Sequence, residues 1–359
     1  MMSKRLAAVL CVLIMIVVAT GALAGTTLTH QTDRNIKIRL TADQQGRFPV
    51  NPVIPGESPT TGLPWSGWYM PMLVQIDNAD GGVGARAPWG ASYADIIYEM
   101  ILHKNGETRL TFLFSDEIPV SAGPVRSGRL GHVWLREEWD AGFLYYGGPK
   151  SEEVSISREF SKLGATKKGV LFNGTDGEAK PWKAFYNRVL GKTGPHNVNA
   201  DVAAIQALIP GDHTAPARPF LFTDELPTEG IFADVISLNW PHRSYRSVFE
   251  YEYDTNLYYR YVRGEPYADD QTDEQIAFSN VIVQRVKVSF ITSAQPSPTL
   301  VGKGNADIFT GGRYIAGYWA RTAMDQRTIF FDADGNELKL QRGTTYIAVM
   351  APENDVEFE

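Results

Sequence analysis

The sequence feature that most constrains this chain is a turn with two arginines, Ser121 to Arg129. It reads Ser-Ala-Gly-Pro-Val-Arg-Ser-Gly-Arg and lies between an apolar run, Leu110–Phe114, and a segment with helical spacing that starts near Leu130. Backbone N–H groups and the helix dipole favour an anion at a helix N-terminus, and guanidinium groups recognise carboxylate or phosphate in pairs of hydrogen bonds. The turn therefore predicts an anion site, and the anion belongs either to a ligand or to the protein's own Asp77 or Glu99.

The segments around this turn alternate between strand and helix patterns, which is typical of an α/β layer. Residues 25–68 are polar and rich in Pro, Gly, Ser and Thr, and predict a spacer. Residues 69–209 then predict a mixed α/β domain, and a Pro-rich linker at 210–219 leads to a smaller β-rich domain over 218–357. The expected fold class is α+β. The segments expected in the first domain are strands at 72–76, 95–102, 108–114, 143–146 and 170–172, with helices starting near 130 and 154.

Polar and glycine residues follow two of these strands where each one ends. Asp77 and Asn78 come after the first strand, and Gly147 and Gly148 come after the strand at 143–146. Ligands of such sheets bind outside the carboxyl ends of the strands, so this edge is the expected place of a site.

The N-terminus predicts export from the cytoplasm. Residues 1–24 carry a basic end, an apolar core from Leu6 to Val18 and a small cleavage pattern, Ala22-Leu23-Ala24, which indicates a signal peptide removed before Gly25. An uncleaved membrane anchor is the alternative. The single cysteine, Cys11, lies inside the apolar core, so the mature chain would contain no thiol for a disulfide, a nucleophile or a metal.

Composition narrows the function classes. The net charge of −7 argues against nucleic acid as the main partner. No metal-binding spacing or cofactor fingerprint is recognised, so neither a metal nor a cofactor is expected.

Several short motifs occur in the order found in the YerB family of bacterial surface proteins, and the chain resembles that family from about residue 50 to its C-terminus. Family members often carry a lipid anchor and have two domains of unknown function. The resemblance therefore implies a two-domain fold and a surface location, and no reaction is established for the family. Cys11 departs from the position that a lipid anchor requires. The motifs are Gly123–Arg129, Ala94–Glu99, Gly106–Arg109, Gly147-Gly148 and Pro195-His196-Asn197.

Three functional hypotheses remain open. The first is an extracytoplasmic envelope protein that binds a cell-wall glycan or an anionic polymer through an Arg/Asp/His pocket. The second is a cell-wall hydrolase or transferase that uses Glu99 or Asp77 with His196; Ser127 has no nearby base in the sequence. The third is a structural protein in which arginines only neutralise carboxylates. The candidate site residues are Asp77, Asn78, Glu99, Arg109, Arg126, Ser127, Arg129, Gly147, Gly148, His196 and Asn197. Arg126 is the candidate for the internal ion pair and Arg129 for the ligand contact.

Overall fold

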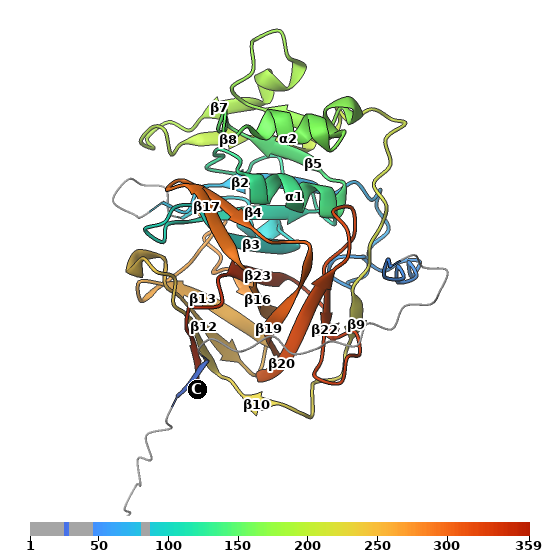
Figure 1. Ribbon diagram of the computed structural model, residues 1–359, viewed down its shortest axis with the longest axis vertical. Helices are drawn as coiled ribbons and strands as arrows, with labels where there is room; N and C mark the ends of the chain where they lie inside the picture. Colours follow the sequence, from blue (N-terminus) through green and yellow to red (C-terminus); the bar gives the residue numbers. More distant parts are fainter. Residues whose placement is uncertain (1–24, 29–45, 80–86) are drawn as a thin grey trace, which may run out of the picture.

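The computed structural model describes residues 25–28, 46–79 and 87–359. The predicted signal peptide, residues 1–24, lies outside these residues. The described chain forms three layers, in which two sheets face each other and helices cover the outer face of the larger sheet (Figure 1).

The larger sheet has eleven strands and runs through both halves of the sequence. Its order is β10-β20-β19-β16-β23-β3-β4-β2-β5-β6, with β21 paired to β20. The strand β23, near the C-terminus, lies between β16 and β3 and is parallel to both, so it joins the two halves. The strands are β2 (Met72–Ile76), β3 (Ile96–Ile101), β4 (Thr108–Phe114), β5 (Gly142–Tyr145), β6 (Leu171–Asn173), β10 (Ile231–Phe232), β16 (Asn280–Arg285), β19 (Gly302–Thr310), β20 (Arg313–Arg321), β21 (Ile329–Phe331) and β23 (Thr345–Met350).

The two faces of this sheet have separate hydrophobic cores, because successive side chains of a strand point to opposite faces. On one face, Leu73 and Tyr98 pack with Val133 and Trp139 of α1 (Leu130–Trp139) and with Phe160 of α2 (Ile156–Lys162). The other face packs on a seven-stranded sheet and on α3 (Val202–Gln206). The seven strands are β1 (Thr26–Leu28), β11 (Val235–Leu238), β12 (Ser247–Glu252), β13 (Leu257–Val262), β14 (Glu265–Pro266), β15 (Ala277–Phe278) and β24 (Val356–Phe358).

Three two-stranded pairs complete the described strands. The pair nearest the arginine turn is β7 (Tyr186–Arg188) with β8 (Val198–Ala200). The other two pairs are β9 (Leu221–Thr223) with β22 (Lys339–Gln341), and β17 (Val288–Thr292) with β18 (Gln295–Pro298).

The predicted fold class, α+β with an N-terminal α/β domain, is wrong. Strands are the predominant regular structure of the described residues, whose three α-helices have ten, seven and five residues. The strands and helices expected between residues 72 and 173 do form. Among the strands expected in the first domain, only β2, β5 and β6 pair with one another in parallel, as an α/β layer requires, whereas β4 is antiparallel to both of its neighbours. The local apolar periodicity predicts these strands and helices, but it does not predict how the strands pair in the sheet.

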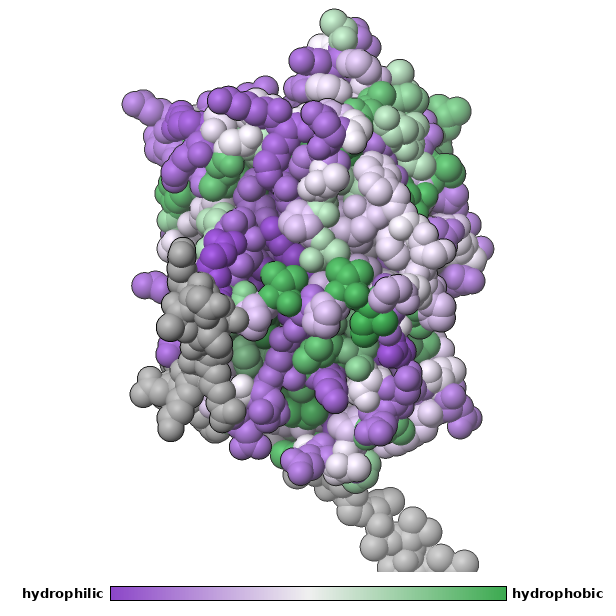
Figure 2. Space-filling model, turned by 90° about the vertical axis from the view of Figure 1, so that its right-hand side faces the viewer, coloured by the Kyte–Doolittle hydropathy of each residue, from purple (hydrophilic) through white to green (hydrophobic). Residues whose placement is uncertain are grey.

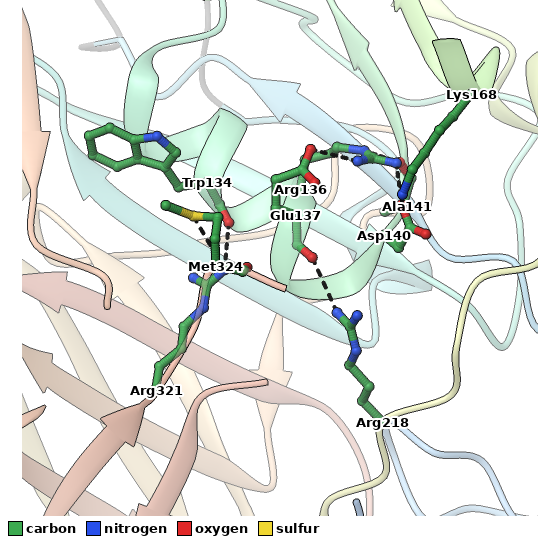
Figure 3. Close-up of polar contacts among 9 residues, drawn as sticks. All are labelled: Trp134, Arg136, Glu137, Asp140, Ala141, Lys168, Arg218, Arg321 and Met324. Carbon is green, nitrogen blue, oxygen red and sulfur yellow. Dashed lines mark hydrogen bonds and ion pairs between the residues drawn. The ribbon is translucent and has the colours of Figure 1, made fainter. Parts of the chain in front are cut away.

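The helix α1 is held in place by cations from both halves of the chain (Figure 3). Arg321 of β20 donates to the carbonyl of Trp134 at 2.8 Å and to the carboxylate of Glu138 at 3.0 Å. Arg218, from the connection after α3, donates to the carbonyl of Glu137 at 3.2 Å. Positive charge near the last carbonyls of a helix stabilises it, because these carbonyls form the negative end of the helix dipole. These contacts fix the position of α1, and the arginine turn leads directly into the N-terminus of this helix.

Part of the predicted spacer contacts the body. Ser58 and Thr61 both donate to the carboxylate of Asp116, at 2.6 and 2.5 Å, and Arg47 pairs with Asp325 at 2.9 Å. Figure 2 looks at the side where this segment lies and shows apolar patches among polar ones. Exposed apolar side chains of the segment are Val50, Val53, Ile54, Leu63 and Trp68. None of the described helices is long and apolar enough to cross a membrane.

Candidate functional site

The arginine turn connects two strands that are far apart in the sequence. On one side, the N–H of Asp77, just after β2, donates to the carbonyl of Pro124 at 2.8 Å. On the other side, the N–H of Val125 donates to the carbonyl of Val198 in β8 at 2.7 Å. The turn thus brings the carboxyl end of β2 next to the loop that precedes β8, which carries His196.

Asp77 is the centre of the resulting cluster, and its side chain is buried. One carboxylate oxygen, Oδ2, lies 2.5 Å from His196 Nδ1 and 2.9 Å from Arg126 Nε. The Arg126 contact is an ion pair, because the N–H of this nitrogen is not aligned for a hydrogen bond. The other oxygen, Oδ1, lies 4.0 Å from a terminal nitrogen of Arg109. Three residues that the sequence singled out, His196, Arg126 and Arg109, therefore surround Asp77.

These four side chains line one cavity of about 460 Å³. The cavity is assembled from both halves of the sequence, since two lining residues lie beyond the predicted linker. Within the described residues, no group of three or more His, Cys, Asp or Glu side chains is placed to hold a metal ion. The complete lining is Asp77, Ala79, Leu102, Glu107, Thr108, Arg109, Arg126, His196, Tyr245 and Arg263.

Positive charge is crowded around this cavity. Arg109 is only 3% exposed, and burial lowers the pKa of its guanidinium to about 9, with Arg129 and Arg126 adding to the shift and Asp77 opposing it. Burial and the nearby Arg126 lower the pKa of Arg129 to about 10. Both arginines stay protonated at neutral pH. Arg109 donates to the carbonyl of Ser127 at 2.6 Å, while its Nε is buried and has no partner within the described residues.

Comparison with known proteins places the chain in a family. Residues 60–215 match the N-terminal domain, and residues 236–347 the C-terminal domain, of a family described as a protein of unknown function, DUF3048. Together the two matches cover more than half of the chain. The chain belongs to the DUF3048 family.

The resemblance to YerB is confirmed. This DUF3048 chain is 24% identical over 291 residues to the putative lipoprotein YerB of Bacillus subtilis strain 168, covering 78% of this chain and 81% of YerB. The crystal structure of the YerB protein from Bacillus subtilis superposes with a TM-score of 0.67 at 23% identity, covering 82% of this chain and 96% of that one. At this identity the structural likeness shows the fold alone.

Two sequence candidates of the DUF3048 chain lie in a neighbouring buried network instead of the cavity. Glu99 is fully buried and pairs with Arg260 at 2.7 Å, also accepting from Tyr346. The amide of Asn78 donates to Glu99 at 3.2 Å and to Thr108 at 2.8 Å. Strand alternation explains the position, since Glu99 points between the two sheets while Tyr98 and its other neighbour on β3, Met100, face the helices.

The remaining candidates support the loops around the cavity. Gly147 donates its N–H to Asn173 at 2.8 Å, and Gly148 lines a separate hollow of about 480 Å³ beside α2. Ser127 donates to the carbonyl of Tyr146 at 3.1 Å. The side chains of Arg129 and Asn197 also contact backbone carbonyls: Arg129 donates to Gly128 and Ala294, and Asn197 to Lys192. None of these five residues is part of the cavity lining.

Sequence reasoning missed six described lining residues. Glu107 and Thr108 are inside the motif Gly106–Arg109, whose spacing singled out the arginine alone. Tyr245 and Arg263 have no local signal, because they reach the cavity through the pairing of β12 and β13 above the larger sheet. The other two, Ala79 and Leu102, follow the ends of β2 and β3.

Proposed function

We propose that this DUF3048 protein is an extracytoplasmic envelope protein that binds an anionic ligand, such as a wall polymer or a charged glycan, in the cavity around Asp77. The observation that carries the proposal is Arg109. It is a buried cation in the cavity wall whose Nε has no partner within the described residues, and a buried donor without a partner is costly. An anion in the cavity would balance the charge of this buried guanidinium group.

The balance of charge supports the same ligand. Arg109 and Arg126 both pair with one carboxylate of the described lining, that of Asp77. Arg126 is partly exposed, with 23% of its side chain accessible, and its ion pair with Asp77 uses Nε rather than the terminal nitrogens. Guanidinium groups bind carboxylate and phosphate oxygens in pairs, which suits a ligand that carries such a group.

The proposed location rests on two further observations. Residues 1–24 have the pattern of a signal peptide, and the relative from Bacillus subtilis is named a putative lipoprotein.

Thermal unfolding with added phosphate tests the binding. A ligand at 100 times its Kd stabilises the folded state by about 2.7 kcal/mol, so inorganic phosphate should raise the Tm of the wild type. Arg126→Ala should abolish the shift. Arg246→Ala removes the same charge from an exposed pair with Glu357 and should keep the shift, which makes it the matched control. Chloride at equal ionic strength corrects for screening.

The proposal fails if phosphate, tested up to saturating concentration against matched chloride, leaves the Tm of the wild type unchanged. Equal shifts in all three proteins would mean that phosphate binds elsewhere.

A further inference from the structure

We infer that the cavity also catalyses a reaction: His196 is a general base that cleaves a phosphodiester held by Arg126 and Arg109. This inference rests on the proposed function, because the anion must bind before it can react.

The hydrogen bond between His196 and Asp77 fixes the state of the imidazole ring. Nδ1 lies 2.5 Å from Oδ2 of the buried carboxylate, so Nδ1 carries the proton and donates it to Asp77. The lone pair of a neutral ring is then on Nε2. The side chain lines the cavity and is 15% exposed. Asp77 is thus a positioning residue that leaves one basic nitrogen for chemistry in the cavity.

The base and the anion donors lie side by side. His196 Nδ1 and Arg126 Nε contact the same oxygen of Asp77, at 2.5 and 2.9 Å. An anion that displaces or extends the contact of Arg126 is therefore next to the imidazole. Guanidinium groups beside the reacting centre stabilise the charge that develops in the transition state of phosphoryl transfer.

The loop that carries His196 is held rigidly. The backbone N–H of His196 donates to the carbonyl of Thr193 at 3.0 Å. The next residue, Asn197, accepts from Arg188 at 2.7 Å and donates to the carbonyl of Lys192 at 3.0 Å. A base fixed by such supporting bonds needs little reorganisation during the reaction.

The lining charges select the class of substrate. Arg109 and Arg126 both pair with the carboxylate of Asp77, so these three groups together carry one positive charge, which matches a monoanion. A phosphodiester keeps a single charge at neutral pH, and its two non-bridging oxygens match the fork of a guanidinium group.

The reaction is a hydrolysis that consumes only water. The water oxygen forms a bond to phosphorus while the bond from phosphorus to the leaving oxygen breaks. Nε2 of His196 takes the proton of the water. The leaving oxygen departs as an anion that solvent protonates, and the imidazolium then releases its proton to solvent.

The test follows release of p-nitrophenolate from bis(p-nitrophenyl) phosphate by the purified full-length protein. His196→Gln should lower kcat about 100-fold or more, the range that general-base catalysis supplies. His213→Gln, at a histidine outside the cavity lining, should keep the wild-type rate. Asp77→Asn should lower kcat without raising KM, because a carboxylate that competes for Arg126 is gone. If Asp77 had only a structural role, its substitution would not lower kcat selectively while leaving KM unraised.

The thermal shift with phosphate, measured on the same preparations, separates the two proposals. Phosphate binding without diester cleavage overturns the inference and leaves the proposed function intact, and equal cleavage by wild type and His196→Gln overturns it as well. Cleavage of p-nitrophenyl phosphate or p-nitrophenyl acetate in place of the diester overturns the substrate class. If the wild type shows neither a thermal shift with phosphate nor cleavage of the diester, both proposals fail.

Discussion

At the scale of single residues, the two arginines of the turn lie in different surroundings. Arg126 was expected in an internal pair and Arg129 against a ligand. Arg126 does pair with Asp77, yet it also lines the cavity and remains partly exposed. Arg129 instead donates to the carbonyls of Gly128 and Ala294. The turn places both guanidinium groups near Arg109, and of the two only that of Arg126 lines the cavity.

The buried pair of Glu99 and Arg260 gives a prediction about stability. Glu99→Gln should cost about 3–5 kcal/mol of unfolding free energy, because it leaves the fully buried Arg260 without its counter-charge. Phosphate should still raise the Tm of the variant, since Glu99 is outside the cavity lining. Urea unfolding measures the loss. Glu357→Gln, in an exposed pair, is the control and should cost about 0–1 kcal/mol. If the variant is as stable as the wild type but phosphate no longer raises its Tm, Glu99 is part of the binding site.

At the scale of elements, α1 begins with a histidine in an unusual capping role. The N–H of Arg129, the residue before the helix, donates to Nδ1 of His132 at 3.1 Å. Burial holds the pKa of His132 well below its usual value, and the nearby Arg109 and Arg129 add to the shift. The ring therefore accepts this hydrogen bond as a neutral group, at the positive end of the helix dipole.

His132 should make folding stability fall between pH 7 and pH 5. The folded state keeps the ring neutral, whereas the unfolded chain binds a proton below about pH 6.5, so the unfolded state gains stability as the pH drops. The slope reaches about 1.4 kcal/mol per pH unit. His132→Gln keeps an acceptor at this position and should flatten the slope, as seen by urea unfolding at several pH values. His103→Gln, in an exposed loop, should not change it. Parallel curves for all three proteins would show that His132 titrates alike in both states.

At the scale of the whole molecule, the sequence predicts local elements much better than their arrangement. The strands at 72–76 and 108–114 and the helix from 130 were readable because apolar spacing reports which face is buried. Asp77, Arg126 and His196 were also readable, as polar residues at a strand end, a turn and a loop. The parallel pairing of Ile96 with Thr345 is invisible to any local pattern, and it joins the two halves of the sequence in one sheet. The same long-range pairing brings Tyr245 and Arg263 to the cavity.

The shared sheet predicts how the two halves behave when the chain is cut. The connection at 210–219 is the place where we expect proteases to cut first, and Gly211 and Asp212 are exposed. A specific protease site inserted between them should be cut without separating the fragments, because β23 of the second half pairs with β3 of the first along five residue pairs. The fragments should therefore elute together in size-exclusion chromatography and separate only in denaturant.

Urea unfolding of the uncut protein should accordingly show a single transition by both fluorescence and circular dichroism. Cutting should lower the midpoint, since the two fragments then gain freedom on unfolding, but it should not split the transition. The uncut protein with the same insertion is the control for the inserted residues. Two transitions, or fragments that separate in native buffer, would mean that the halves are independent domains. Separation would also remove Tyr245 and Arg263 from the cavity, so phosphate should then no longer stabilise the cut protein.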